Sequence, residues 1–193
     1  MRQLSGLERA RAALEKGGRF PAGALAPPIA RSWRRCVDLG LDPNGRPDGP
    51  VVEAANLHEK RERRDLLRRL AIAEMQLLYS QIAGPNFMIA FGDPDGVVLD
   101  TISDHHFAGT AAGRVIVPGS IWTEGVRGTN ALGLVAIEKT PVAVYGREHY
   151  FACQSQVSCM AAPVFDSTGQ IVGMLDASCS HEARQEHTMA LVR

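Results

Sequence analysis

The stretch that decides the fold is residues 86–102, NFMIAFGDPDGVVLDTI. Two apolar segments, 86–92 and 97–102, flank the tetrapeptide Asp93-Pro94-Asp95-Gly96. Proline and aspartate favour a tight turn, and the glycine accepts a positive φ without a steric penalty. The spacing therefore predicts a hairpin of two short strands.

The same unit returns near the end of the chain. Residues 164–172, VFDSTGQIV, lead to Leu175-Asp176 as the first unit leads to Leu99-Asp100. Further strands are expected at 141–145 and 156–165. Strands in this order, with helices before, between and after them, predict an α+β domain with an antiparallel sheet.

The segment between the two hairpins has a different amino-acid composition. Residues 103–129 are rich in Gly, Ser and Thr, and Thr129 or Asn130 is placed to cap a helix over 131–139. We expect this insert, 103–139, to cover one face of the sheet, where small-molecule pockets are often found.

Helices are expected on both sides of this core. A long amphipathic helix is predicted over 59–82, with Leu67, Leu70, Ala71, Met75, Leu78 and Ile82 on one stripe. Another should run from His181 toward residue 193. Residues 1–55 are interpreted as an N-terminal helical segment with a Pro- and Gly-rich connector, and residues 56–193 as the main domain with its sheet core at 86–178.

The net charge of zero hides two unlike halves. Residues 1–70 hold 15 basic and 9 acidic residues, a net +6, whereas residues 71–193 hold 6 and 12, a net −6. A basic half suggests nucleic acid as a partner. However, basic and acidic residues alternate at helical spacing in 59–69, which favours a solvated or dimer-flanking helix face.

Secretion and membrane insertion are not indicated. No apolar run approaches the roughly 18 residues that cross a bilayer, and the N-terminus has no signal-peptide core. We therefore expect a cytoplasmic protein without membrane contact, whose four cysteines are thiols rather than disulfides.

Several motifs in order give the sequence a family resemblance. They are Arg31-Ser32-Trp33-Arg34-Arg35-Cys36 with Gly40-Leu41-Asp42-Pro43, Trp122-x-Glu124 with Gly128-Thr129-Asn130-Ala131-x-Gly133, Pro141-Val142-x-Val144-x-Gly146-x-Glu148-His149, Cys159-x-Ala161-Ala162-Pro163, and Gly173-x-Leu175-Asp176. Residues 28–193 resemble the sensory region of acetoin-catabolism activators, which are sigma-54-dependent transcriptional regulators with a GAF sensor domain.

The resemblance implies a GAF-like sensor that binds a small-molecule effector and forms a homodimer. Such regulators contact DNA through a separate helix-turn-helix module and carry an ATPase module with a phosphate-binding loop. This chain contains neither pattern. We therefore expect DNA contact only through a module absent from this chain. The chain itself is expected to be either an isolated sensor region or a stand-alone GAF protein.

Six residues are predicted to bind the ligand: Phe107, Trp122, Glu124, His149, Cys153 and Cys159. Trp122 would form an aromatic wall, and the Glu148-His149 pair matches the family wording. For Cys153 and Cys159, pocket lining and inert packing remain open alternatives. Thr129 and Asn130 are interpreted as a turn and helix cap.

No catalytic set and no metal site are predicted, and the sequence does not indicate a cofactor. The chain is therefore interpreted as a ligand-sensing regulatory domain rather than an enzyme. Two alternatives stay open: a thiol-dependent GAF enzyme, similar to methionine-sulfoxide reductases, that uses Cys153 and Cys159, and a direct DNA-binding module.

Overall fold

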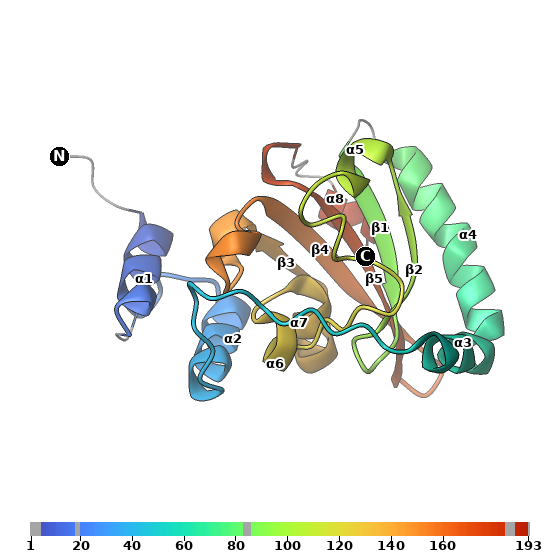
Figure 1. Ribbon diagram of the computed structural model, residues 1–193, viewed down its shortest axis with the longest axis horizontal. Helices are drawn as coiled ribbons and strands as arrows, with labels where there is room; N and C mark the ends of the chain where they lie inside the picture. Colours follow the sequence, from blue (N-terminus) through green and yellow to red (C-terminus); the bar gives the residue numbers. More distant parts are fainter. Residues whose placement is uncertain (1–4, 18–19, 83–85, 184–187, 193) are drawn as a thin grey trace.

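A five-stranded antiparallel sheet forms the centre of the protein (Figure 1). The computed structural model describes residues 5–17, 20–82, 86–183 and 188–192. The sheet order is β2-β1-β5-β4-β3. Its strands are β1 (Phe87–Gly92), β2 (Val98–Ser103), β3 (Val142–Tyr145), β4 (Val157–Phe165) and β5 (Ile171–Ser180). The α+β class and both expected hairpins are confirmed.

Helices surround this sheet. The described α-helices are α1 (Gly6–Glu15), α2 (Pro27–Asp38), α3 (Ala54–Arg63), α4 (Asp65–Gln81), α5 (His105–Ala108), α6 (Glu124–Arg127), α7 (Ala131–Glu138) and α8 (Thr188–Val192). Short 3₁₀ turns, η1 (Gly146–Glu148), η2 (Ala152–Gln154) and η3 (His181–Ala183), connect some of them to the strands. Figure 1 shows α1 and α2 at the opposite end of the molecule from α4.

The two faces of the sheet carry different layers because side chains alternate along each strand. On one face, Met174 and Cys159 pack with α7, the insert and the N-terminal helices. On the other, Ala177 and Met160 pack with α4 and α8. Asp176 belongs to the first face, and it therefore points into the layer formed by the insert.

Both hairpin turns use one local design. The carboxylate Oδ1 of Asp93 accepts hydrogen bonds from the backbone N–H groups of Asp95 and Val97, each 3.0 Å long. Asp166 does the same in the second hairpin, and both turns contain a glycine at positive φ, 78° and 81°. The sequence repeat is therefore a repeat of an aspartate-anchored turn.

The long helix expected over 59–82 is two helices. The chain breaks at Arg64 (φ −118°, ψ 21°), and α3 lies crosswise to α4 at the end of the β1–β2 hairpin (Figure 1). With α3 turned, Arg61 reaches Asp100 at 3.3 Å while Arg68 reaches the same carboxylate at 2.6 Å. Tertiary ion pairs on the hairpin thus accompany the break, which helical periodicity alone does not reveal.

One member of the predicted stripe also faces the other way. Met75 and Leu78 are buried against the sheet as expected, but the side chain of Leu70 is 60% exposed. Residue 70 lies a full turn after Leu66, which is also exposed, and so belongs to a second, outward stripe.

The expected C-terminal helix from His181 is only partly present. Residues 181–183 form η3, and α8 covers Thr188–Val192. Positions 184–187 and 193 lie outside the described residues. Within the described ranges, no helix combines the length and the apolar character that crossing a bilayer requires.

Candidate functional site

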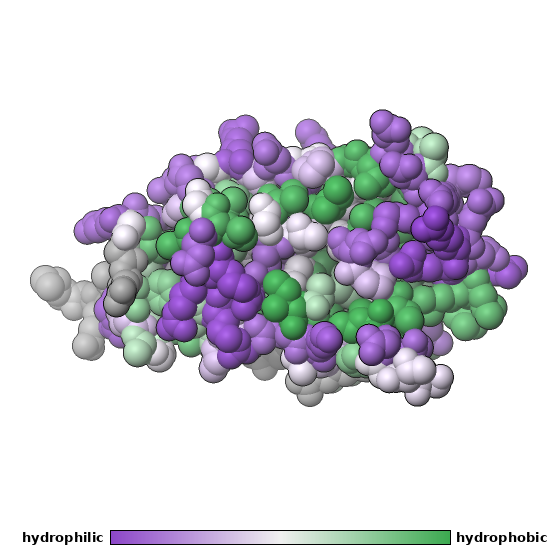
Figure 2. Space-filling view, turned by 90° about the horizontal axis from the view of Figure 1, so that it is seen from below, coloured by the Kyte–Doolittle hydropathy of each residue, from purple (hydrophilic) through white to green (hydrophobic). Residues whose placement is uncertain are grey.

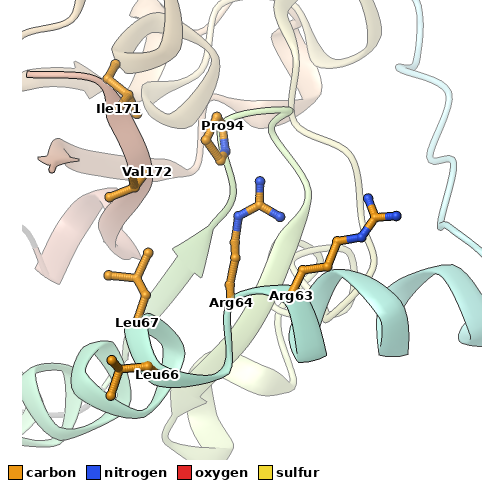
Figure 3. A pocket seen from close by; sticks show the side chains of 7 residues that line it. All are labelled: Arg63, Arg64, Leu66, Leu67, Pro94, Ile171 and Val172. Atoms are coloured by element: carbon orange, nitrogen blue, oxygen red, sulfur yellow. The ribbon is translucent and has the colours of Figure 1, made fainter. Parts of the chain in front are cut away.

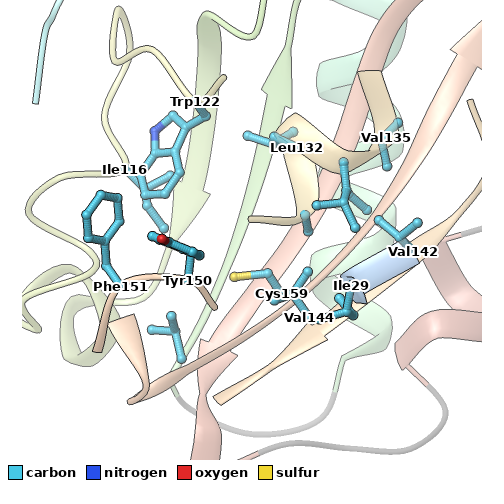
Figure 4. Close-up of a cluster of buried hydrophobic side chains, with 14 of the residues drawn as sticks. Ile29, Ile116, Trp122, Leu132, Val135, Val142, Val144, Tyr150, Phe151 and Cys159 are labelled. Atoms are coloured by element: carbon cyan, nitrogen blue, oxygen red, sulfur yellow. The ribbon is translucent and has the colours of Figure 1, made fainter. Parts of the chain in front are cut away.

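A small cavity lies between the sheet and the insert. It leaves about 10 Å³ of free space, which is close to the room that one water molecule occupies. Its lining comes from the insert, α7 and the two central strands: Ile116, Trp122, Asn130, Ala131, Leu132, Cys159, Asp176 and Ser178. Figure 4 shows the Sγ of Cys159 pointing toward the side on which Ile116, Trp122 and Phe151 lie.

The most unusual group in this lining is the carboxyl of Asp176. Its side chain is buried, its Oδ2 accepts a 2.6 Å hydrogen bond from the hydroxyl of Ser178, and its Oδ1 has no partner. Burial raises the pKa of Asp176 to about 7. A buried oxygen without a partner is costly, so a water or ligand that donates a hydrogen bond would be favoured here.

A line of polar side chains continues from Asp176 through the core. The Oγ of Ser178 lies 3.1 Å from the Sγ of Cys159, which lies 3.5 Å from Nε2 of His149. The Nδ1 of His149 is 2.9 Å from the carbonyl oxygen of Gly146 and therefore carries a proton that it donates.

The single hydroxyl proton of Ser178 cannot serve both Asp176 and Cys159. When Asp176 is protonated it donates to Ser178, Ser178 donates to Cys159, and the thiol donates to His149. When Asp176 is ionised, Ser178 donates to the carboxylate, and its oxygen can then only accept a hydrogen bond from the thiol of Cys159. The protonation state of Asp176 therefore sets the order of the whole line.

His149 is held neutral in this line. The side chain is buried, and burial lowers the pKa of His149 to about 4. It was expected to line or gate the pocket. The structure places it behind Cys159, where it orients the thiol rather than lining the cavity.

The two cysteines predicted for the site are in different environments. Cys159 is buried in β4, and burial raises its pKa well above that of an ordinary thiol. Cys153 lies in η2 and is exposed. A thiol of raised pKa is a poor nucleophile, and an exposed cysteine does not share its cavity, so the geometry does not favour a thiol enzyme that uses both.

Trp122 lines the cavity, as expected. Its indole Nε1 donates a 2.9 Å hydrogen bond to the hydroxyl of Ser120, which fixes the plane of the ring. The guanidinium of Arg127 lies over the indole, with its Cζ 4.7 Å from the ring centroid. The ring is therefore held from two sides.

Glu124 and Phe107 lie outside the cavity lining. Glu124 is buried but forms an ion pair with Arg35, which occupies both of its carboxylate oxygens. Phe107 is fully buried in the hydrophobic core on the insert side. For these two residues the structure offers packing roles, and their contact with a ligand stays a prediction.

Asn130 has the capping role expected from the sequence. Its Oδ1 accepts a 2.8 Å hydrogen bond from the N–H of Gly133 at the start of α7, and its Nδ2 donates to the carbonyl of Gly128. Asn130 also lines the cavity, so the cap of α7 and the cavity wall are one structure.

Asp176 and Ser178 were missed as site residues. The available signal was a carboxylate and a hydroxyl at alternate positions of an otherwise apolar strand, which must point to one face of the sheet. Asp176 had been noted only as part of the hairpin repeat and the family motif.

A larger hollow lies elsewhere, at the junction of α3 and α4. It has a volume of about 390 Å³ and is lined by Arg63, Arg64, Leu66, Leu67, Pro94, Ile171 and Val172. Figure 3 shows Leu67 pointing toward Val172 and Arg64 extending toward Pro94. None of the predicted ligand-binding residues contributes to this open surface feature.

The sheet order, the helical layers and the cavity under the insert define a GAF-like α+β domain. The family description "MimR, N-terminal domain" matches residues 5–193, and the chain belongs to this family. The resemblance to the sensor region of acetoin-catabolism activators is thereby confirmed.

Two curated relatives are named as regulatory proteins. The chain is 32% identical over 166 residues, 84% of its length, to the acetoin catabolism regulatory protein of Cupriavidus necator. It is 30% identical over 91% of its length to the acetoin dehydrogenase operon transcriptional activator AcoR of Bacillus subtilis. It spans 25% and 29% of these proteins, respectively. The chain therefore spans between a quarter and a third of the length of these relatives.

A solved structure has the same fold. The chain superimposes on a chain of the Escherichia coli DhaR(N)–DhaL complex with a TM-score of 0.81 and 22% identity, covering 86% of this chain and 57% of the other. At this identity the likeness concerns the fold.

Proposed function

We propose that this chain is the effector-sensing region of a cytoplasmic, sigma-54-dependent transcriptional activator. In this proposal a small molecule binds between the sheet and insert 103–139, and the helices that flank the sheet transmit its presence. The observation that carries the proposal is the unpartnered Oδ1 of Asp176 in the cavity under the insert.

The cavity chemistry indicates what kind of effector would fit. A hydroxyl group would donate to Oδ1 of Asp176, and the apolar walls of Ile116 and Leu132 would contact short alkyl groups. A carboxylate effector would be repelled whenever Asp176 is ionised. The effector is therefore a small, neutral molecule with a hydroxyl group.

Entry of such a molecule requires the insert to move. A volume of about 10 Å³ holds no more than one water molecule. Trp122 or α7 must therefore shift away from the strands before a larger molecule can bind. Binding energy would thus favour an expanded conformation over the compact one, which is how a ligand shifts a population.

The signal has a direct route to the other face of the sheet. Asp176 and Ser178 alternate in β5 with Ala177 and Cys179, which belong to the core formed with α4 and α8. A displacement of β5 would therefore change the packing of both α4 and α8 on the sheet. We propose that α4 also forms the homodimer contact, through its exposed Leu66, Leu70 and Leu77.

Figure 2 views the molecule from the side on which α3 lies. At the right-hand end, where Figure 1 places α3 and α4, hydrophilic side chains gather beside a band of hydrophobic ones. This combination of an apolar band with a charged border is typical of a protein contact.

A protein effector is the second candidate. The E. coli DhaR N-terminal region was solved in a complex with DhaL, and the cavity of the present chain is small. A sensor that responds to a protein partner needs no ligand volume in its core.

The test uses the melting temperature of the purified chain with a matched series of small alcohols, diols, ketones and carboxylates. We expect a hydroxyl compound to raise the melting temperature in a saturable way, and Asp176→Asn to weaken that response at least tenfold. Asp166→Asn, at the exposed turn of the same hairpin, is the control. A series that never shifts the wild type would contradict the proposal and favour the protein effector.

A further inference from the structure

Arg127 is a buried cation without an anion. The residue is 4% exposed, and its Nε has no hydrogen-bond partner. Within the described residues, no carboxylate lies at ion-pair distance from its guanidinium. A buried, uncompensated charge is strongly unfavourable, so this position is expected to have a partner that the described residues do not supply.

Five other cations that are buried or half-buried at the packed surfaces of the fold are compensated. The partners are Glu15 and the carbonyl of His149 for Arg11, Glu124 for Arg35, Asp93 for Lys60, and Asp100 for both Arg61 and Arg68. Arg127 departs from this rule although it is among the most buried of them.

The environment of Arg127 leaves the edge of its guanidinium for an anion. One face lies 4.7 Å from the centroid of the Trp122 ring, which holds the group in a defined plane. On another side Nη2 faces Gly49, at which an added Cβ would lie 3.1 Å from this nitrogen. A planar fork of N–H donors held by stacking is the geometry that pairs with a carboxylate.

The segment over this edge is lightly attached. The carbonyls of Pro43 and Pro50 accept backbone hydrogen bonds from Ala152 and Ile121. Between these two points, the described residues 44–49 make backbone hydrogen bonds only to Asp42. The connector can therefore open at Gly49 without breaking the sheet or a helix.

We propose that Arg127 binds the carboxylate of a small monocarboxylate, at a site separate from the Asp176 cavity. The single charge of the guanidinium matches a single negative charge, whereas a phosphate dianion would stay half-compensated. Because Trp122 contacts both Arg127 and the cavity, the two sites share one wall. The chain thus has places for two chemically different ligands.

The experiment replaces sodium chloride with sodium acetate or sodium propionate at constant ionic strength and follows the melting temperature. Acetamide serves as the neutral analogue. We expect a saturable rise with the carboxylates and none with acetamide. The half-saturating concentration should increase at least tenfold in Arg127→Gln and remain unchanged in Arg34→Gln, an exposed arginine that also lies over an aromatic ring.

The same variants separate binding from a merely structural role. Without carboxylate, Arg127→Gln should melt at or above the wild-type temperature because it removes an unpaired buried charge. If that variant does not fold, Gly49→Ala keeps the charge but crowds Nη2 and should also weaken the response. An identical response of the wild type to acetate and chloride, or an acetate response that Arg127→Gln retains, would overturn the proposal. This result is independent of the response to hydroxyl compounds that Asp176→Asn tests, so either proposal can fail without the other.

Discussion

The guanidinium of Arg35 donates two hydrogen bonds, each 2.7 Å long, to the carboxylate of Glu124. This bidentate pair joins α2 in the N-terminal segment to α6 in the insert. Ile29 and Trp33 of α2 are buried in the same hydrophobic core as the sheet residues on this face. The helices before residue 55 therefore support the wall of the cavity. The domain boundary between residues 55 and 56 stays a prediction from the sequence.

Replacing Glu124 with Gln should lower the free energy of unfolding by about 2 kcal/mol. The variant leaves the half-buried guanidinium of Arg35 with one neutral acceptor at position 124, and its remaining ion pair is the longer 3.5 Å contact to Glu138. Urea denaturation measures the change. Glu59→Gln, in an exposed pair with Arg63, should change stability by less than about 0.5 kcal/mol. Equal effects of the two substitutions would contradict the structural role assigned to Glu124.

Asp176 makes stability depend on pH in an unusual direction. Its pKa is about 7 in the folded protein and near 3.8 when exposed, so the folded state binds the proton more tightly. Stability from this group is therefore present at low pH and is lost as the pH rises toward 7. Asp176→Asn removes this loss, and its stability relative to the wild type should increase by roughly 2 kcal/mol between pH 5 and pH 8.

The comparison between variant and wild type is needed because His149 acts in the opposite sense. Its pKa is lowered to about 4, so the stability it contributes is present above its ordinary pKa and is lost as the pH falls. Both proteins retain His149, and subtracting their unfolding free energies removes its contribution. A difference that is constant between pH 5 and pH 8 would show that Asp176 titrates normally.

The local parts of this fold were predictable from the sequence. The turns at Asp93 and Asp166 depend on hydrogen bonds within five residues, so the Asp-x-x-Gly pattern is sufficient to predict the turn. The cap at Asn130 is equally local. The break at Arg64 was not predictable, because it depends on where Asp100 of another element lies.

The cavity was only partly predictable for the same reason. Trp122 and Cys159 were expected there, and both line it. Glu124 does not line it, because its carboxylate pairs with Arg35, which lies 89 residues earlier in the chain, and its contact with a ligand stays a prediction. Whether a buried polar residue faces a ligand or an ion pair is decided by such long-range contacts, which one sequence does not reveal.

Asn130→Ala should destabilise the protein by about 1–2 kcal/mol. The substitution removes the cap hydrogen bond to the N–H of Gly133 and the bond to the carbonyl of Gly128, both of which are buried. Asn130→Asp keeps the acceptor and should retain most of the cap. Thermal unfolding of the two variants distinguishes them, and equal loss in both would mean that the capping acceptor is not the important feature.

The outward stripe of α4 provides a test of the homodimer. Leu66, Leu70 and Leu77 are 68%, 60% and 52% exposed, and their spacings of four and seven residues place them along one side of the helix. An apolar stripe with this spacing is typical of a helix that packs against an equivalent helix. Leu70→Glu should therefore shift the protein from dimer to monomer in sedimentation velocity while leaving its fold intact, because the side chain does not contribute to the core.

Val37→Glu is the matched control, since Val37 is 48% exposed on α2, far from α4. It should leave the dimer unchanged. Ligand response supplies a second comparison: if α4 carries the signal, Leu70→Glu should still bind the hydroxyl effector, because Asp176 faces the other side of the sheet. A wild-type chain that sediments as a monomer at every concentration, or equal dissociation by Val37→Glu, would exclude α4 as the dimer contact.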